Sequence, residues 1–223
     1  MKKVVTVKRR ALEASEERAQ ALRNRFAASR TLVVNLISSP GSGKTTLLEA
    51  TVSGLEGELK CAVIEGDVAT ENDADRIRAL GVPAHQILTG GSCHLDARQV
   101  ENGLEAGNIP EVDILFIENV GNLICPTTYD LGEDFKVVVL SVAEGDDKPV
   151  KYPAIFSRAE VAVVSKSDLL PYVPFNLDSV RSQIASLNPD GTILVTASLT
   201  GEGIDGWLDL LRDRLATKRR VTQ

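Results

Sequence analysis

A glycine-rich loop at residues 38–46 has the residue types that bind phosphate groups. It reads SSPGSGKTT and lies between an apolar run and a stretch of helical character, which is the placement of a P-loop. Glycines let backbone N–H groups turn toward a phosphate, and the following helix N-terminus adds positive charge. We expect Lys44 to reach the β- and γ-phosphates and the Thr45 hydroxyl to ligate magnesium. The expected nucleotide contacts are Gly41, Ser42, Gly43, Lys44, Thr45 and Thr46.

A second polar motif, at residues 165–168, is similar to the guanine-reading sequence Asn-Lys-x-Asp of GTPases. It reads SKSD and also follows an apolar run. The Asp168 carboxylate can accept the ring N–H and the exocyclic amino group of guanine, a pair of donors that adenine lacks. We expect the Lys166 stem to lie on the base and Ser198 to add a weaker contact. Ser165 replaces the usual Asn, so we expect selectivity to persist through Asp168 with weaker nucleotide affinity.

Two acidic residues at the ends of apolar runs fit a role in holding magnesium and positioning water. Asp67 follows one run, and Glu118 begins Glu-Asn-Val-Gly, where many GTPases have Asp-x-x-Gly. The Gly121 N–H would contact the γ-phosphate and couple loop position to nucleotide state. Each carboxylate alone fits a helix cap or loop anchor equally well, but their shared position favours function. We expect the catalytic residues to be Lys44, Asp67 and Glu118, and the magnesium ligands to be Thr45, Asp67 and Glu118.

Two cysteines and a histidine offer donor atoms of a softer kind. Cys93 and His94 are adjacent, and Cys125 comes four residues after Gly121. Thiolate and imidazole suit zinc, nickel or copper(I) and not magnesium. Three ligands are one short of a closed zinc site and no Cys-x-x-Cys spacing is present, so a metal site and two buried cysteines with a surface histidine stay equally open. We interpret Cys61, inside an apolar run, as a core residue.

Composition excludes several classes of protein. The 223 residues include 25 Lys and Arg against 31 Asp and Glu, a net charge of -6, and 43% are apolar, which suffices for a core. Net acidity argues against a protein that coats nucleic acid. No apolar run reaches the ~18 residues of a membrane span, and no secretory signal is recognisable. Three cysteines are too few for a disulfide framework, which favours the cytoplasm.

The elements expected to position these residues alternate between strands and helices. The expected strands are Leu32–Ile37, Ala62–Ile64, Ile114–Ile117, Val137–Val142, Val161–Val164 and Ile193–Val195. The expected helices between them are Thr45–Ser53, Asp73–Leu80, Leu95–Leu104, Leu177–Leu187 and Ile204–Leu215. This alternation predicts an α/β P-loop NTPase fold, with a mostly parallel central sheet flanked by helices and ligands beyond the carboxyl ends of the strands.

The first 30 residues differ from the rest. Apolar residues spaced seven, three and four apart form one stripe of a helix that we expect to pack on the main domain; they are Leu12, Ala19, Leu22 and Phe26. We therefore divide the chain into an N-terminal helical extension, residues 1–30, and a P-loop GTPase domain, residues 31–223.

Four segments together resemble the hydrogenase nickel-incorporation GTPases, the HypB family. They are residues 35–49, 89–97, 118–126 and 144–149, and the similarity extends over nearly the whole chain. The related urease-accessory GTPases have a Cys-Pro-His motif, whereas Cys93 and His94 are adjacent here. That contrast favours HypB, with a urease-type nickel-accessory GTPase kept as an alternative. Residues 1–30 contain no Cys or His, so we do not expect the additional N-terminal metal segment of some members.

The resemblance implies a cytoplasmic GTP-hydrolysing nickel metallochaperone that acts in the maturation of nickel-iron hydrogenase. It implies GTP and magnesium as cofactors, and a nickel or zinc site of Cys93, His94 and Cys125 shared across a homodimer. The implied partners are a hydrogenase accessory protein and the hydrogenase large-subunit precursor, with no nucleic acid or membrane. We expect slow intrinsic hydrolysis, because no arginine finger or glutamine is evident. Two rival functions stay open from the residues alone: a P-loop small-molecule kinase, and a metal-binding protein without enzymatic activity.

Overall fold

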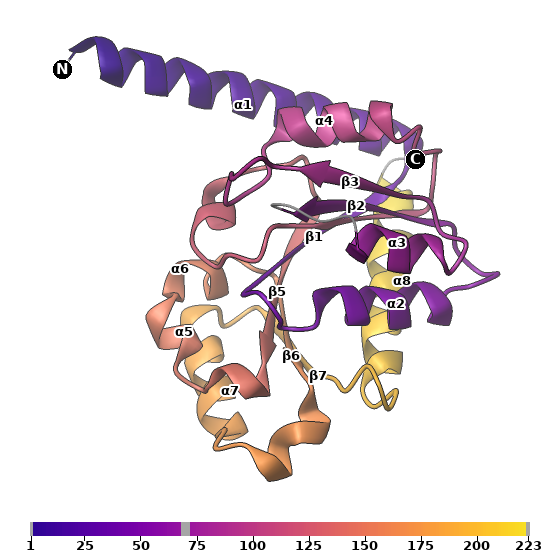
Figure 1. Cartoon of the computed structure of the whole chain (residues 1–223), viewed down its shortest axis with the longest axis vertical. Coiled ribbons are helices and arrows are strands. Elements are labelled where there is room, and N and C mark those ends of the chain that lie inside the picture. Colours follow the sequence, from indigo (N-terminus) through magenta and orange to yellow (C-terminus); the bar gives the residue numbers. More distant parts are fainter. Residues whose placement is uncertain (1, 68–71, 222–223) are drawn as a thin grey trace.

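Seven strands form one sheet in which every neighbouring pair is parallel, in the order β3-β2-β4-β1-β5-β6-β7 (Figure 1). The computed structural model describes residues 2–67 and 72–221, and side chains from residue 14 onward. The strands are β1 (Leu32–Ser38), β2 (Cys61–Asp67), β3 (Ala84–Leu88), β4 (Ile114–Glu118), β5 (Phe135–Ser141), β6 (Val161–Ser165) and β7 (Thr192–Val195). The predicted fold class is confirmed.

Helices cover both faces of the sheet, because the central strands are buried on both sides. The α-helices are α1 (Lys2–Ser29), α2 (Lys44–Gly54), α3 (Asn72–Arg78), α4 (Ala97–Ala106), α5 (Lys148–Lys151), α6 (Pro153–Phe156), α7 (Leu177–Leu187) and α8 (Ile204–Val221). The 3-10 helices are η1 (Cys125–Thr128), η2 (Val142–Glu144) and η3 (Ser167–Tyr172). Helices α2 and α8 share one core cluster with the sheet, and α1 and α4 share another on the opposite face (Figure 1). Successive residues of β1 alternate between the two faces, which explains its uninterrupted apolar sequence.

Several elements differ from the predicted ones, and three of the differences have local reasons. Strand β3 was not predicted, because its sequence AHQIL is polar and lies at the sheet edge. Helix α4 begins at Ala97 and not at Leu95, because the Asp96 carboxylate accepts a hydrogen bond from the Gln99 N–H in a capping box. Val142 leaves strand β5 and begins η2.

Helix α1 contributes side chains to the core. Ala19, Leu22 and Phe26 are buried against the sheet, while the side chain of Leu12 lies outside the described ones. Among residues 2–67 and 72–221, no helix combines the length and apolar character needed to span a bilayer.

Trp207 of α8 fixes α2, the helix whose N-terminus follows the P-loop. Its indole is fully buried, and Nε1 donates a 2.8 Å hydrogen bond to Thr51 Oγ1. The Thr51 hydroxyl in turn donates to the Leu47 carbonyl at 2.6 Å. One side chain therefore supplies both apolar burial and a buried hydrogen bond between the two helices.

We predict that Trp207→Phe lowers the free energy of unfolding by about 2 kcal/mol, because it leaves a cavity and removes the donor to Thr51. Urea denaturation followed by far-ultraviolet circular dichroism measures this, since Trp207 is the chain's single tryptophan. The control Tyr172→Phe, at an 82% exposed residue, should change stability by less than about 0.5 kcal/mol. Equal stabilities of the two variants would contradict the prediction.

Candidate nucleotide and metal sites

The loop between β1 and α2 has the backbone of a phosphate cradle. Gly41 and Gly43 have φ angles of 75° and 90°, a region that side chains with a Cβ rarely adopt. The Lys44 ammonium donates to Ser38 Oγ at 2.8 Å and lies 3.7 Å from Glu118 Oε1. Ser38, in the place of the usual first glycine, thus supplies an acceptor for the P-loop lysine.

A cavity of about 440 Å³ adjoins this loop at the carboxyl ends of β1, β2 and β4. The predicted nucleotide-site residues that line it are Gly41, Gly43, Lys44, Thr45, Thr46, Asp67, Glu118, Gly121 and Lys166. The Ser42 side chain is buried, and its hydroxyl donates to the Ser39 carbonyl within the loop. Gly121 lies so close to the P-loop that a Cβ there would stand 2.9 Å from Pro40 Cγ. The structure therefore brings the predicted switch loop against the phosphate loop.

Oxygen donors suited to magnesium meet in this cavity. The Thr45 hydroxyl donates to Glu118 Oε1 at 3.1 Å, and Asp67 lines the same space. Within the described part of the chain, Glu118 Oε2 and Glu65 Oε1 are buried without a hydrogen-bond partner. Buried carboxylate oxygens need a compensating proton or cation, and hard oxygen ligands suit magnesium. The residues present therefore fit a magnesium ion beside the phosphates.

Glu65 is a residue of this cavity that the sequence motifs did not indicate. Parallel pairing places it opposite Glu118, and it is only 2% exposed. Burial, followed by the Glu118 charge, raises the pKa of Glu65 to about 10. Burial also raises the pKa of Glu118, against the opposing effect of Lys44. Glu65 stands two residues before Asp67, and this spacing puts both side chains on one face of a strand. The spacing could therefore have indicated Glu65 from the sequence.

The motif after β6 braces the P-loop. Ser165 Oγ donates to the Ser42 carbonyl at 2.6 Å, and Lys166 Nζ donates to the Gly41 carbonyl at 2.7 Å. Lys166 adopts a left-handed backbone with φ of 60°, which turns the chain into η3. Although serine is shorter than the usual asparagine, the Ser165 hydroxyl still reaches the loop. The predicted loss of nucleotide affinity at this position stays a prediction.

Asp168, in η3, and Ser198, in the turn after β7, lie in segments that are joined by a hydrogen bond. The Ser167 N–H donates to the Thr196 carbonyl at 3.0 Å, which joins the start of η3 to the turn after β7. Both Asp168 and Ser198 are half-buried, and neither is part of the cavity lining. Their expected contacts with a guanine base stay predictions.

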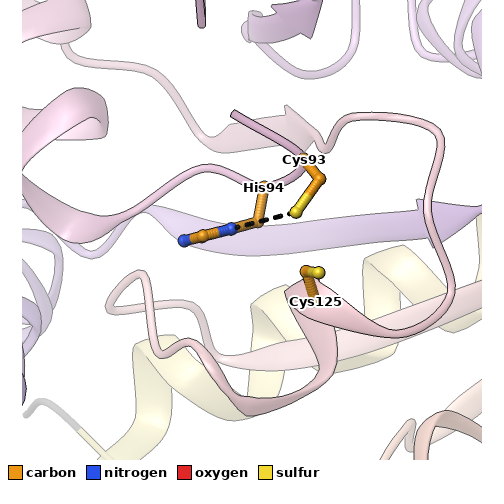
Figure 2. A group of neighbouring side chains, drawn as sticks. All are labelled: Cys93, His94 and Cys125. Atoms are coloured by element: carbon orange, nitrogen blue, oxygen red, sulfur yellow. Dashed lines mark hydrogen bonds between the residues drawn. The ribbon is translucent and has the colours of Figure 1, made fainter. Parts of the chain in front are cut away.

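The three soft donors converge at one point. The Cys93 and Cys125 sulfurs and a His94 ring nitrogen all lie within 4.8 Å of one another, with Cys93 Sγ 3.7 Å from His94 Nδ1 (Figure 2). Cys93 is exposed, and His94 and Cys125 are half-buried. Cys61 is buried in β2, where burial raises the pKa of its thiol to about 12, so it suits the core and not a metal site.

Two asparagines that the sequence motifs did not indicate connect the segment that carries Cys125 to the loop that carries Cys93 and His94. Asn119 Oδ1 accepts from the Leu95 N–H at 3.1 Å, and Asn122 Nδ2 donates to the Cys93 carbonyl at 3.2 Å. Hydrogen bonds from the segment after β4 therefore hold the loop before α4 at the two residues that flank His94. Both asparagines lie within two residues of Gly121. A side-chain amide can both accept and donate a hydrogen bond, so its position beside a glycine is the sequence signal that could have indicated them.

The electrostatics of the trio favour a neutral imidazole. Burial lowers the pKa of His94, so its ring carries a free lone pair at neutral pH. A hydrogen bond with the neighbouring Cys125 thiol raises the pKa of Cys93, and burial and the charge of Cys125 add to this shift. A bound cation favours the thiolate form of both cysteines, which makes the trio chemically suited to a thiolate-preferring metal.

Comparisons with known proteins point to one family. Residues 32–195 match the family described as CobW/HypB/UreG, nucleotide-binding domain. The hydrogenase maturation factor HypB of Escherichia coli K12 is 50% identical over 200 residues, which are 90% of this chain and 69% of that protein. Two crystal structures are each 38% identical. HypB of Archaeoglobus fulgidus has a TM-score of 0.85, over 91% of this chain and 99% of that one. HypB of Helicobacter pylori in complex with nickel has a TM-score of 0.86, over 94% and 97%.

The two crystal structures have the same fold as this chain. The sequence identities of the three relatives, 38% to 50%, are well above the level at which two proteins share only a fold. The resemblance stated from the sequence is thereby confirmed, and the chain belongs to the HypB family of hydrogenase maturation factors, within the CobW/HypB/UreG nucleotide-binding domains.

Proposed function

We propose that this chain is a cytoplasmic GTP-hydrolysing nickel metallochaperone, which delivers nickel during the maturation of nickel-iron hydrogenase. The segment 118–125 is the observation that carries the proposal. Glu118 at its start accepts from Thr45 in the nucleotide cavity, and Cys125 at its end belongs to the metal trio. A nickel ligand candidate thus stands seven positions after a magnesium ligand candidate in the chain.

Contacts along this segment support a coupling between nucleotide and metal. Gly121 abuts Pro40 of the P-loop, and the next residue, Asn122, holds the Cys93 carbonyl. A γ-phosphate that draws the Gly121 N–H toward it would therefore shift the support of Cys93 and move Cys125 along the same segment. Such a shift changes metal affinity only if the two nucleotide states favour different loop positions.

Hydrolysis would use the P-loop and its neighbours. Thr45, Glu118 and Asp67 would hold a magnesium ion, which would supply positive charge beside the phosphates, and Lys44 would stabilise the transferred group. Arg76 also lines the cavity, but its guanidinium is bound to Glu49 at 2.6 Å and Asp73 at 3.3 Å. An arginine already paired with two carboxylates is a poor donor to a transition state, which agrees with slow intrinsic turnover.

A second copy of the chain would complete the metal site. Three donors are one short of a closed tetrahedral set, and Cys93 is open to solvent. Ile124, beside Cys125, is 66% exposed, which leaves apolar surface next to the ligands. We infer a homodimer around a two-fold axis near this point, with nickel passing to an accessory protein and then to the hydrogenase large-subunit precursor.

Phosphate release separates this function from a kinase and from a metal-binding protein without activity. A GTPase releases phosphate from GTP and not from ATP, without any acceptor. A small-molecule kinase needs an acceptor, and a metal-binding protein without activity releases none. Measuring phosphate with each nucleotide and no acceptor therefore tests the proposal directly.

We predict that Lys44→Ala lowers GTP hydrolysis at least ~100-fold, because it removes the cation that faces the β- and γ-phosphates. Lys60→Ala, at an exposed lysine just before β2, is the matched control and should retain full turnover. Phosphate release at saturating GTP measures both variants. Full turnover in Lys44→Ala would remove the P-loop from the mechanism.

We predict that Cys125→Ala weakens nickel binding more than tenfold. Loss of a residue that only supports a metal ligand already costs ~10- to 100-fold in metal affinity, and Cys125 is a candidate ligand itself. Cys61→Ala removes the buried cysteine and should leave nickel affinity unchanged. Competition with a chromophoric chelator gives both affinities, and circular dichroism checks the fold. Equal affinity of Cys125→Ala and the natural chain would exclude Cys125 as a ligand.

We predict that Asp168→Asn lowers the preference for GTP over XTP by at least ~100-fold, because an amide can donate to the xanthine carbonyl that a carboxylate repels. Dissociation constants for fluorescent analogues of the two nucleotides measure the preference. Asp178→Asn, on the exposed start of α7, is the control. An unchanged ratio in Asp168→Asn would mean that Asp168 does not read the base.

A further inference from the structure

We propose that Tyr129 is a positioning residue for His94, whose ring it holds beside the two thiols so that the trio binds a metal ion as one unit. This inference rests on the proposed role of the trio as a nickel site. Tyr129 contributes no donor atom to the trio, and the sequence motifs did not indicate it.

The contact between the two rings is direct. The His94 and Tyr129 ring centroids are 3.8 Å apart, and the ring planes are inclined by 25°. In this stacked arrangement the Tyr129 phenol covers one face of the imidazole. His94 Nδ1 at the ring edge faces Cys93 Sγ at 3.7 Å (Figure 2). The stack restricts the plane of the imidazole, and the plane decides whether a ring nitrogen points at the metal position.

Tyr129 stands on the same short turn as another ligand. Cys125 begins η1, and Tyr129 is the residue that ends it, with its N–H donating to the Pro126 carbonyl at 3.4 Å. The ring that orients His94 and the thiol of Cys125 therefore move as one piece. A shift of this turn carries the sulfur and the support of the imidazole together.

The next residue anchors this turn to helix α1. Both Asp130 carboxylate oxygens accept from Arg23 at 2.7 Å, and Asp130 Oδ1 also accepts from the Gly132 N–H at 2.8 Å. Gly132 packs so closely on α1 that a Cβ there would stand 2.8 Å from Leu22 Cβ. These contacts fix the backbone beside Tyr129 through residues that are not members of the trio.

The histidine backbone is held independently of Tyr129. Ser92 Oγ donates to the His94 carbonyl at 2.9 Å, and Asn119 holds the following N–H. Loss of the tyrosine ring would therefore free the imidazole about its own side-chain torsions and leave the loop in position. A ligand that must be ordered on binding costs affinity that a pre-ordered ligand does not.

The test is a double-mutant cycle between Tyr129 and His94 in the full chain. We expect Tyr129→Leu to weaken nickel and zinc binding about tenfold and to alter the thiolate-to-nickel absorption band, while Tyr129→Phe, which keeps the ring, stays within about twofold of the natural chain. In a His94→Ala background, Tyr129→Leu should have no further effect on affinity. Tyr172→Leu, at an exposed tyrosine, is the control for loss of a phenol.

Three results would overturn the inference. One is an unchanged affinity and absorption band in Tyr129→Leu, and another is an equal loss in Tyr129→Phe and Tyr129→Leu. The third is an undiminished effect of Tyr129→Leu without His94, since the ring would then act on the fold or the thiols. If the natural chain itself bound no nickel, the proposed function would fail first, which distinguishes the two failures.

Discussion

Parallel pairing of β1 with β4 is the interaction on which the arrangement of both sites depends. The register Leu36↔Glu118 ends β4 beside the start of the P-loop, so that Glu118 meets Thr45 and Lys44. Because β2 pairs with the other side of β4, Asp67 reaches the same edge. A shift of one residue in the β1–β4 register would turn the Glu118 side chain to the opposite face of the sheet and so remove it from the cavity.

The chain that leaves β4 serves both sites in succession. It passes the P-loop at Gly121, supports Cys93 through Asn122, supplies Cys125 and ends on Tyr129 against His94. At each point the contact is a tight approach, a directed hydrogen bond or a ring stack, so in the proposed function a displacement at one end would be passed to the other. Communication between nucleotide and metal then requires only that the bound nucleotide favour one position of this segment.

Periodicity and motif spacing were sufficient for the central strands and the P-loop, because each leaves a local signal in the sequence. The three members of the metal trio were given by the family resemblance, since the residues alone left a metal site and two core cysteines equally open. Strand β3 left none, since an edge strand buries only one of its residues fully and its sequence is polar. Glu65 needed the β2–β4 register to become the neighbour of Glu118. Tyr129 needed the fold as well, because its partner lies 35 residues away on another loop. What the sequence could not provide is contact between segments that only the sheet brings together.

The two kinds of donor are kept apart by burial as well as by chemistry. The carboxylates of Glu65 and Glu118 are almost fully enclosed, whereas the exposed Cys93 and half-buried Cys125 stand at the surface. Thiolate and imidazole donors suit nickel and zinc and not magnesium, so in the proposed function the trio would take the transported metal and leave magnesium to the oxygen donors. An exposed thiol also leaves one side of a bound ion open to an incoming ligand. In the proposed function, a carrier must release its metal to a partner, and a coordination set that the chain does not close by itself permits that exchange.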